Sequence, residues 1–115
     1  MSARTGSPRD IVDITDDISN ALAASGIADG HVVVSVAGST CALVVNERES
    51  GLLSDIQRTM ERVETASDPS LTIGAPSIVL PAADGQLRLG TWQRVLLVEL
   101  AAGGERSVTV RVEGE

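Results

Sequence analysis

Residues 84–100, with the sequence DGQLRLGTWQRVLLVEL, contain the only aromatic residue of this 115-residue chain, Trp92. Asp84 and Gly85 are typical of a tight turn, and Gly90 interrupts the strand pattern before the apolar run that follows Trp92. The segment therefore predicts a strand, a kink and a second strand. Because an indole combines a large apolar surface with one N–H donor, Trp92 is expected either to fill the core or to form a wall of a polar cleft.

The rest of the chain supplies an aliphatic core. Hydrophobic residues make up 43% of the sequence and are mainly Val, Leu, Ala and Ile, since Phe and Tyr are absent. The β-branched residues among them favour sheets. A chain of this length forms one domain and buries about two thirds of the surface that it exposes when unfolded. The composition therefore predicts a single domain that is mostly β or α+β.

The charged residue types exclude several functions. The formal net charge is −7, and all nine basic residues are arginines. An acidic chain with no basic patch and no interleaved aromatic residues is not expected to bind nucleic acid. The absence of lysine excludes Schiff-base catalysis, pyridoxal-phosphate attachment and a P-loop lysine. One histidine and one cysteine cannot build the usual zinc site within one protomer.

Targeting signals are also absent from the sequence. No apolar run approaches the length of a membrane span, and the first ten residues lack the hydrophobic region of a signal peptide. The single Cys41 cannot form an intramolecular disulfide, which agrees with a reducing compartment. These observations predict a cytoplasmic protein without membrane contact.

The order of the secondary-structure elements can be read from turn residues and hydrophobic periodicity. Residues 1–9 are small and polar and are expected to form a disordered tail, so the predicted domain covers residues 10–115. Thr15 is expected to begin a helix that Gly26 ends. A second helix is predicted over residues 52–63, where apolar residues recur at helical spacing. Strands are predicted at residues 11–14, 31–36, 41–45, 77–80, 86–89, 92–100 and 107–113, with Gly103 and Gly104 joining the last two as a hairpin.

Several segments occur in the order that is typical of the YjbQ family, whose members are also called secondary thiamine-phosphate synthases. The most specific is Gly90-Thr91-Trp92-Gln93. Weaker matches are Asp13-Ile14-Thr15-Asp16, Ser39-Thr40, Asn46-Glu47, Gly51-Leu52-Leu53, Ala75-Pro76-Ser77, Gly85 with Leu87 and Leu89, Leu97-Val98-Glu99-Leu100 and Gly114-Glu115. The chain resembles this family over residues 11–115.

The resemblance implies both a fold and an activity. The fold is α+β, a β-sandwich of mostly antiparallel strands with two helices, assembled as a homotrimer with sites in clefts near the protomer boundaries. The activity joins a pyrimidine diphosphate to a thiazole phosphate with the help of a divalent metal ion.

The sequence departs from the family pattern at two places that carry chemistry. The loop that usually reads His-Thr-Thr reads Gly38-Ser39-Thr40 here. The later segment with an Asn and a His-x-His pair followed by Lys is deleted between Val63 and Ala75. These histidines could bind a metal ion or transfer protons near neutral pH. The remaining histidine, His31, lies at the entry to a strand and is expected to be an ordinary surface residue.

The candidate site residues are those that match the family or could bind an anion. Glu47 is the candidate catalytic residue, as a general base or metal ligand, and its alternative role is to begin the following helix. Hydroxyl, amide and guanidinium groups suited to a phosphorylated ligand occur at Ser39, Thr40, Asn46, Gln93, Arg88 and Arg94, and Trp92 would lie beside them. Ser39 and Thr40 could equally satisfy a turn, and the arginines could simply be exposed strand residues.

Two functions remain open at this point. In the first, the chain is a trimeric ligand-binding or assembly module that has lost the metal and histidine site of the family. In the second, it is a weak enzyme of the thiamine-phosphate synthase type that uses Glu47, Gln93 and an arginine, with Mg²⁺ as the cofactor. The first is favoured, because the second must hold and expel a pyrophosphate without lysine or the family's histidines.

Overall fold

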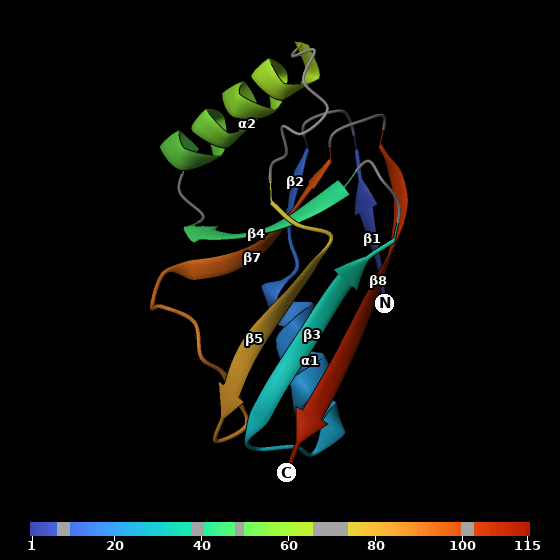
Figure 1. Cartoon of the computed structure of the whole chain (residues 1–115), viewed down its shortest axis with the longest axis vertical. Helices are drawn as coiled ribbons and strands as arrows, with labels where there is room; N and C mark the ends of the chain where they lie inside the picture. The colour runs from blue at the N-terminus through green and yellow to red at the C-terminus, as the bar shows by residue number, and fades with distance from the viewer. Residues whose placement is uncertain (7–9, 38–40, 48–49, 66–73, 100–102) are drawn as a thin grey trace.

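Two β-sheets and two helices make up the described part of the chain (Figure 1). The structure is a computed structural model that describes residues 1–6, 10–37, 41–47, 50–65, 74–99 and 103–115. The helices are α1 (Thr15–Ser25) and α2 (Ser50–Thr65). The strands are β1 (Ser2–Thr5), β2 (Ile11–Asp13), β3 (Gly30–Val36), β4 (Cys41–Glu47), β5 (Ser77–Ala83), β6 (Gln86–Leu87), β7 (Gln93–Glu99) and β8 (Gly104–Gly114).

Both sheets are antiparallel. The larger sheet has five strands in the order β1-β8-β3-β5-β6, and the smaller sheet has three in the order β2-β7-β4. Long β-branched runs such as His31–Val36 form the central strands, because branched side chains pack well on a pleated surface. The structure confirms the predicted α+β class with mostly antiparallel strands and two helices.

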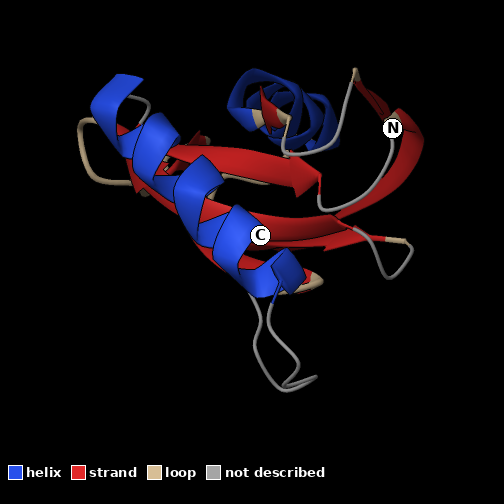
Figure 2. Ribbon diagram, turned by 90° about the horizontal axis from the view of Figure 1, so that it is seen from above, coloured by secondary structure: helices blue, strands red, loops and turns tan. Residues whose placement is uncertain are grey.

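The main core lies between the inner face of the larger sheet and two elements behind it, the smaller sheet and α1 (Figure 2). Its buried members come from all three of these elements, and they include Val32 and Val34 of β3, Leu97 of β7, and Ile18 and Leu22 of α1. Helix α1 ends where Gly26 adopts the left-handed conformation with φ of 73°, as the sequence predicts. Helix α2 contributes Ile56 to a second, smaller cluster on the far face of the smaller sheet.

The N-terminal segment differs from the sequence-based expectation. Residues 2–5 form β1 instead of a disordered tail, and they pair with β8 over the whole length of β1. Ala3 and Thr5 point inward and are buried, while Ser2 and Arg4 are exposed. The inward-facing residues Ala3 and Thr5 are too small or too polar to produce a hydrophobic pattern in the sequence. The strand could not be predicted from this segment alone, because its stability comes from pairing with β8.

The predicted hairpin around Gly103 and Gly104 is also wrong. Strand β7 pairs with β2 and β4, whereas β8 pairs with β1 and β3 in the other sheet. The physical reason is visible in the burial patterns, because Val95–Glu99 is buried without interruption while β8 alternates between exposed and covered positions. A continuous buried run belongs to a sheet that is covered on both faces, and an alternating run to a sheet with one face in water.

Candidate functional site

Four of the predicted site residues meet at the end of the β4–β7 ladder. Asn46 lies directly opposite Arg94, and Glu47 lies directly opposite Gln93. Successive side chains of a strand point to opposite faces of the sheet. The Asn46–Arg94 pair therefore lies on one face of the smaller sheet and the Glu47–Gln93 pair on the other.

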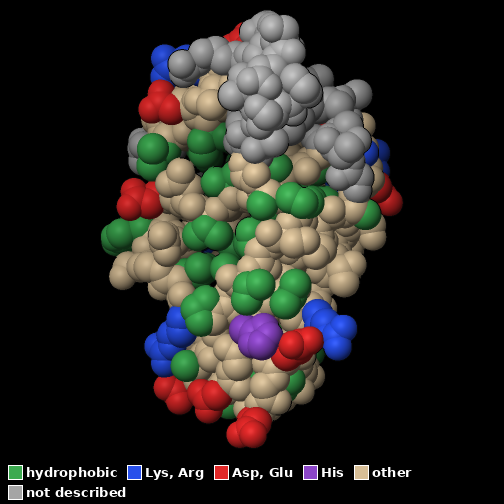
Figure 3. Space-filling model, viewed as in Figure 1, with side chains coloured by type: hydrophobic (Ala, Val, Ile, Leu, Met, Phe, Trp, Pro, Cys, Tyr) green, Lys and Arg blue, Asp and Glu red, His purple; other side chains and the backbone are tan. Residues whose placement is uncertain are grey.

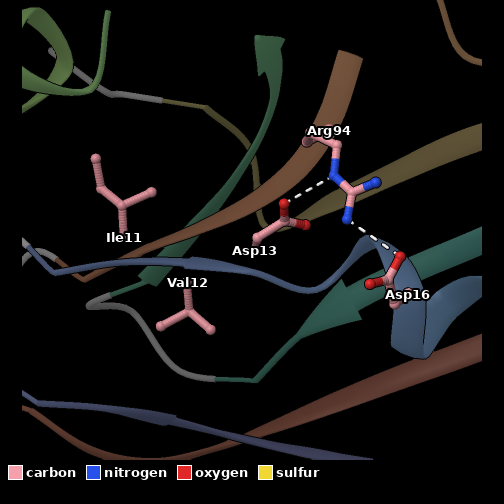
Figure 4. Close-up of a pocket in the computed structure, with 5 residues that line it drawn as sticks. All are labelled: Ile11, Val12, Asp13, Asp16 and Arg94. Carbon is pink, nitrogen blue, oxygen red and sulfur yellow. Dashed lines mark hydrogen bonds and ion pairs between the residues drawn. The ribbon is translucent and has the colours of Figure 1, made fainter. Parts of the chain in front are cut away.

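Arg94 is held by two carboxylates, one at the end of β2 and one in the first turn of α1 (Figure 4). Its Nε donates to Asp13 Oδ2 at 2.8 Å, and its Nη2 donates to Asp16 Oδ1 at 3.1 Å. These three residues, with Ile11 and Val12 of β2, line an open pocket of about 410 Å³. The third nitrogen, Nη1, points away from both carboxylates in Figure 4. The pocket thus presents one edge of a guanidinium that is already oriented.

The two partners of Arg94 differ in their exposure. The side chain of Asp13 is 12% exposed, while that of Asp16 is 86% exposed. Burial by itself raises the pKa of Asp13, but hydrogen bonds from Arg94 and Thr15 and the charge of Arg94 hold the pKa below its usual 3.8. The hydrogen bond to Asp13 is also the main cause of the raised pKa of Arg94. Asp13 and Arg94 are therefore charged throughout the ordinary pH range.

The joint between β2 and α1 fixes Asp13 in this position. The backbone N–H of Thr15 donates to Asp13 Oδ1 at 3.0 Å, and the Thr15 hydroxyl accepts the N–H of Val95 at 2.7 Å. The N–H of Ile14 donates to the Val95 carbonyl at 3.0 Å. Strand β7 is therefore fastened to the first turn of α1 one residue after Arg94, which limits the movement of the pocket.

Trp92 does not fill the core, which was one of its two expected roles. It lies in the turn before β7, and it is 74% exposed. The turn is closed by the N–H of Gln93 donating to the Gly90 carbonyl and by Gln93 Oε1 accepting the N–H of Gly90. Gln93 therefore shapes this turn. The composition alone cannot show that the single ring of the chain projects into solvent.

Among the described residues, the candidates Glu47 and Arg88 do not line the pocket. Glu47 is exposed, and Arg88 forms an ion pair with Asp84 at 3.0 Å. His31 accompanies Glu113 on the surface of the larger sheet, with 3.0 Å between Nε2 and Oε2. Ser39 and Thr40 lie outside the described residues.

A metal site is not formed within the part of the chain that the structure describes. No three His, Cys, Asp or Glu side chains come together there in a way that could hold a metal ion. In the same described residues, no helix has both the length and the apolar character of a membrane span.

One buried polar cluster is missing from the sequence-based candidates. Glu99 is completely buried and accepts hydrogen bonds from the Thr5 hydroxyl and from Arg106 Nε, both at 2.6 Å. The hydrogen bond to Glu99 raises the pKa of Arg106 despite the opposing effect of desolvation. Cys41, the cross-strand neighbour of Glu99, is buried beside them. The sequence signal that could have identified this cluster is the acidic residue Glu99 in an otherwise apolar strand. Because the cluster joins β1, β7 and β8, its role is to hold the two sheets together.

The geometry and the sequence together identify the class of protein. The chain belongs to the YjbQ family, since a family model described as UPF0047 protein YjbQ-like matches residues 1–115. It is 35% identical to a UPF0047 protein of Archaeoglobus fulgidus over 125 aligned positions, which cover 96% of this chain and 97% of that protein. The aligned positions exceed the 115 residues of this chain, so the relative contains residues that this chain lacks.

Solved structures share the fold over nearly the full length. A YbjQ-like protein of unknown function from Sulfolobus solfataricus superimposes with a TM-score of 0.89 and 32% identity, covering 100% of this chain and 94% of the other. A hypothetical protein from Aeropyrum pernix gives a TM-score of 0.90 and 31% identity, covering 100% and 96%. The YjbQ-like fold is therefore confirmed for this chain.

Proposed function

We propose that this protein is a ligand-binding and assembly module of the YjbQ family that works in the cytoplasm as a homotrimer without the family's histidine chemistry. The ligand is a small phosphorylated molecule that binds at Arg94. The observation that carries this proposal is the orientation of the Arg94 guanidinium by Asp13 at the edge of an open pocket.

Exchange of one ion pair explains how a phosphate could bind beside two acidic residues. Asp16 is 86% exposed, and exposed ion pairs contribute little because water and salt screen them. A phosphoryl group can therefore replace Asp16 and take both Nη1 and Nη2, the end-on edge that suits two parallel hydrogen bonds. Asp13 keeps Nε fixed during this exchange. The amide of Asn46, opposite Arg94 on the same face, provides a further donor for the ligand.

The alternative is a weak thiamine-phosphate synthase, which joins a pyrimidine diphosphate and a thiazole phosphate. It needs Glu47, Gln93 and an arginine around one substrate, and the β4–β7 register places Glu47 and Gln93 on the opposite face from Arg94. This arrangement favours ligand binding over catalysis by that set. Product formed from the two phosphates above the level of a heat-killed control would reverse the preference.

Titration with inorganic phosphate and with pyrophosphate tests the ligand proposal. Asp16→Asn removes a competing carboxylate at contact distance, so calorimetry should show affinity about fivefold higher than in the wild type. Arg94→Gln should abolish binding. Arg88→Gln is the matched control, because Arg88 is also a strand-end arginine paired with an exposed aspartate. Binding that survives in Arg94→Gln, or no binding by either wild type or Asp16→Asn, would refute the proposed site.

Light scattering tests the assembly part separately. A homotrimer should give three times the 11.9 kDa mass of the chain. A mass of one chain at high protein concentration would refute assembly without affecting the ligand measurement.

A further inference from the structure

The side chains that line the pocket carry more negative than positive charge. Asp13 and Asp16 are carboxylates, and Arg94 is the one cation among the five lining residues. The other arginines whose side chains the structure describes each contact a carboxylate elsewhere, on faces such as the one in Figure 3, and they are Arg4, Arg58, Arg88, Arg106 and Arg111. An anion that enters the pocket therefore meets one guanidinium and an excess of one negative charge.

The two carboxylates differ in what they lose when a phosphoryl group takes Nη1 and Nη2 of Arg94. Asp13 keeps the hydrogen bonds from Arg94 Nε and from the N–H of Thr15. In the described part of the chain, the side chain of Asp16 has one partner, Arg94 Nη2 at 3.1 Å. Phosphate binding therefore leaves the Asp16 carboxylate unpaired beside a second anion, and the two like charges repel.

We infer that the ligand is a phosphorylated amine, whose phosphoryl group binds Arg94 and whose ammonium group binds Asp16. This inference rests on the proposed phosphate site at Arg94 and names the class of ligand that the site selects. The ammonium group replaces the partner that Asp16 loses, so it offsets the repulsion that a simple phosphate meets in the pocket. An ammonium group has three donors and an aspartate carboxylate only accepts, so the two are matched in hydrogen bonding as well as in charge.

Distances in the pocket limit the spacing between the two charged groups of the ligand. Asp16 Oδ1 lies 3.1 Å from Arg94 Nη2. A phosphoryl oxygen that takes this nitrogen lies about 2.8 Å from it, so a short aliphatic chain is enough to carry an ammonium group from the phosphate to Asp16. The other lining residues, Ile11 and Val12, have aliphatic side chains without donors or acceptors. Asp16 is therefore the lining side chain that can accept from the ammonium group.

The exposure of Asp16 sets the size of the effect. Its side chain is 86% exposed, so water and salt screen the contact with the ammonium group. A contact of this kind should raise affinity about two- to fivefold over that of the same phosphate without an amine. The amine therefore decides which phosphate is preferred, while Arg94 supplies most of the affinity.

Calorimetry of the full chain with two matched probes tests the inference. The probes are O-phosphoethanolamine and monopropyl phosphate, in which a methyl group stands in place of the ammonium group. The wild type should bind O-phosphoethanolamine about two- to fivefold more tightly than monopropyl phosphate. Asp16→Asn should abolish this preference, because it removes the partner of the ammonium group and also relieves the repulsion of the simple phosphate. Asp16→Glu retains a carboxylate and should retain the preference.

Asp17→Asn is the control for the overall charge of the protein. Asp17 is an exposed residue in the same first turn of α1, and it does not line the pocket. This variant removes the same charge as Asp16→Asn and should leave the preference unchanged. A preference that both variants reduce equally would reflect general repulsion of the more negative probe and would overturn the inference.

The outcomes separate the ligand class from the phosphate site. A preference that is present in the wild type and lost only in Asp16→Asn supports the inference. If the two probes bind the wild type equally, or if the preference persists in Asp16→Asn, the ligand class is wrong. The phosphate site still stands in that case, provided that Arg94→Gln abolishes binding. If neither probe binds the wild type or Asp16→Asn, the phosphate site and this inference are both overturned.

Discussion

Asp13 is the residue on which the geometry of the pocket depends. It accepts a hydrogen bond from Arg94 through one carboxylate oxygen and from the N–H of Thr15 through the other. Its side chain is almost covered, whereas Asp16 is open to water. A covered carboxylate that is paired on both oxygens stabilises the folded state only while it is ionised.

Asp13→Asn should therefore change the acid limb of the stability curve. The folded-state pKa of Asp13 is below its usual 3.8, so its stabilisation is present above about pH 4 and is lost as the pH falls through the lower folded value. Near pH 7 the variant should be less stable by about 1–2 kcal/mol, and the difference should shrink as the pH falls further below the usual pKa of an aspartate. Urea unfolding at several pH values measures this.

Asp17→Asn is the control, since Asp17 is an exposed residue in the same first turn. It should cost about 0.5 kcal/mol at most. A difference between Asp13→Asn and the wild type that stays constant from pH 7 to the acid range would contradict the role of ionised Asp13.

The sequence could identify residue types at this site but not their grouping. Asn46 and Arg94 were recognisable as polar residues at strand ends, and their contact depends on the register of β4 against β7. One partner of Glu99 lies far from it in the chain, since Thr5 is 94 residues away. Pairings of this kind arise from packing between sheets, which leaves no periodic signal in the sequence.

Among the elements, the two helices have very different attachments to the molecule. Helix α1 buries Ile18 completely in the main core. Helix α2 is the more amphipathic segment, yet Ile56 is only partly buried where it packs against Ala42 and Val98. The more amphipathic of the two helices is therefore the one that packs less firmly against the rest of the molecule.

Truncating the same residue type in each helix should reveal the contrast. Ile18→Ala should lower the free energy of unfolding by about 3 kcal/mol, because it leaves a cavity in a fully packed core. Ile56→Ala should cost less than about 1 kcal/mol, because less apolar surface leaves water at that position. Denaturant unfolding of the two variants provides the comparison, and equal losses would show that α2 is as firmly packed as α1.

At this scale local signals predicted most elements and failed on how they connect. The spacing of apolar residues gave both helices, and the β-branched runs gave β3 and β4. The hairpin between β7 and β8 was wrong because two glycines indicate a turn but not the sheet that the next strand joins. Strand β1 was missed because its stability comes from β8.

For the whole molecule, the net charge governs how copies approach one another. The chain carries a formal net charge of −7, so two copies repel one another. Raising the salt from about 50 to about 500 mM shortens the Debye length from roughly 14 to roughly 4 Å. This screening should relieve the repulsion between copies and strengthen self-association severalfold, as measured by sedimentation. Weaker association at high salt would instead indicate a contact between opposite charges.

The position of β8 has a consequence for synthesis of the chain. Strand β8 lies between β1 and β3. Strand β1 therefore cannot join the rest of the larger sheet until residues 104–114 are available. These residues are synthesised after those of β1 and β3, and until β8 is present each of these two strands has an edge with unpaired N–H and C=O groups. Contacts between such distant segments form slowly, and exposed strand edges pair readily with other chains. The nascent chain therefore completes its larger sheet only after residues 104–114 have left the ribosome, and it is most prone to aggregate before then.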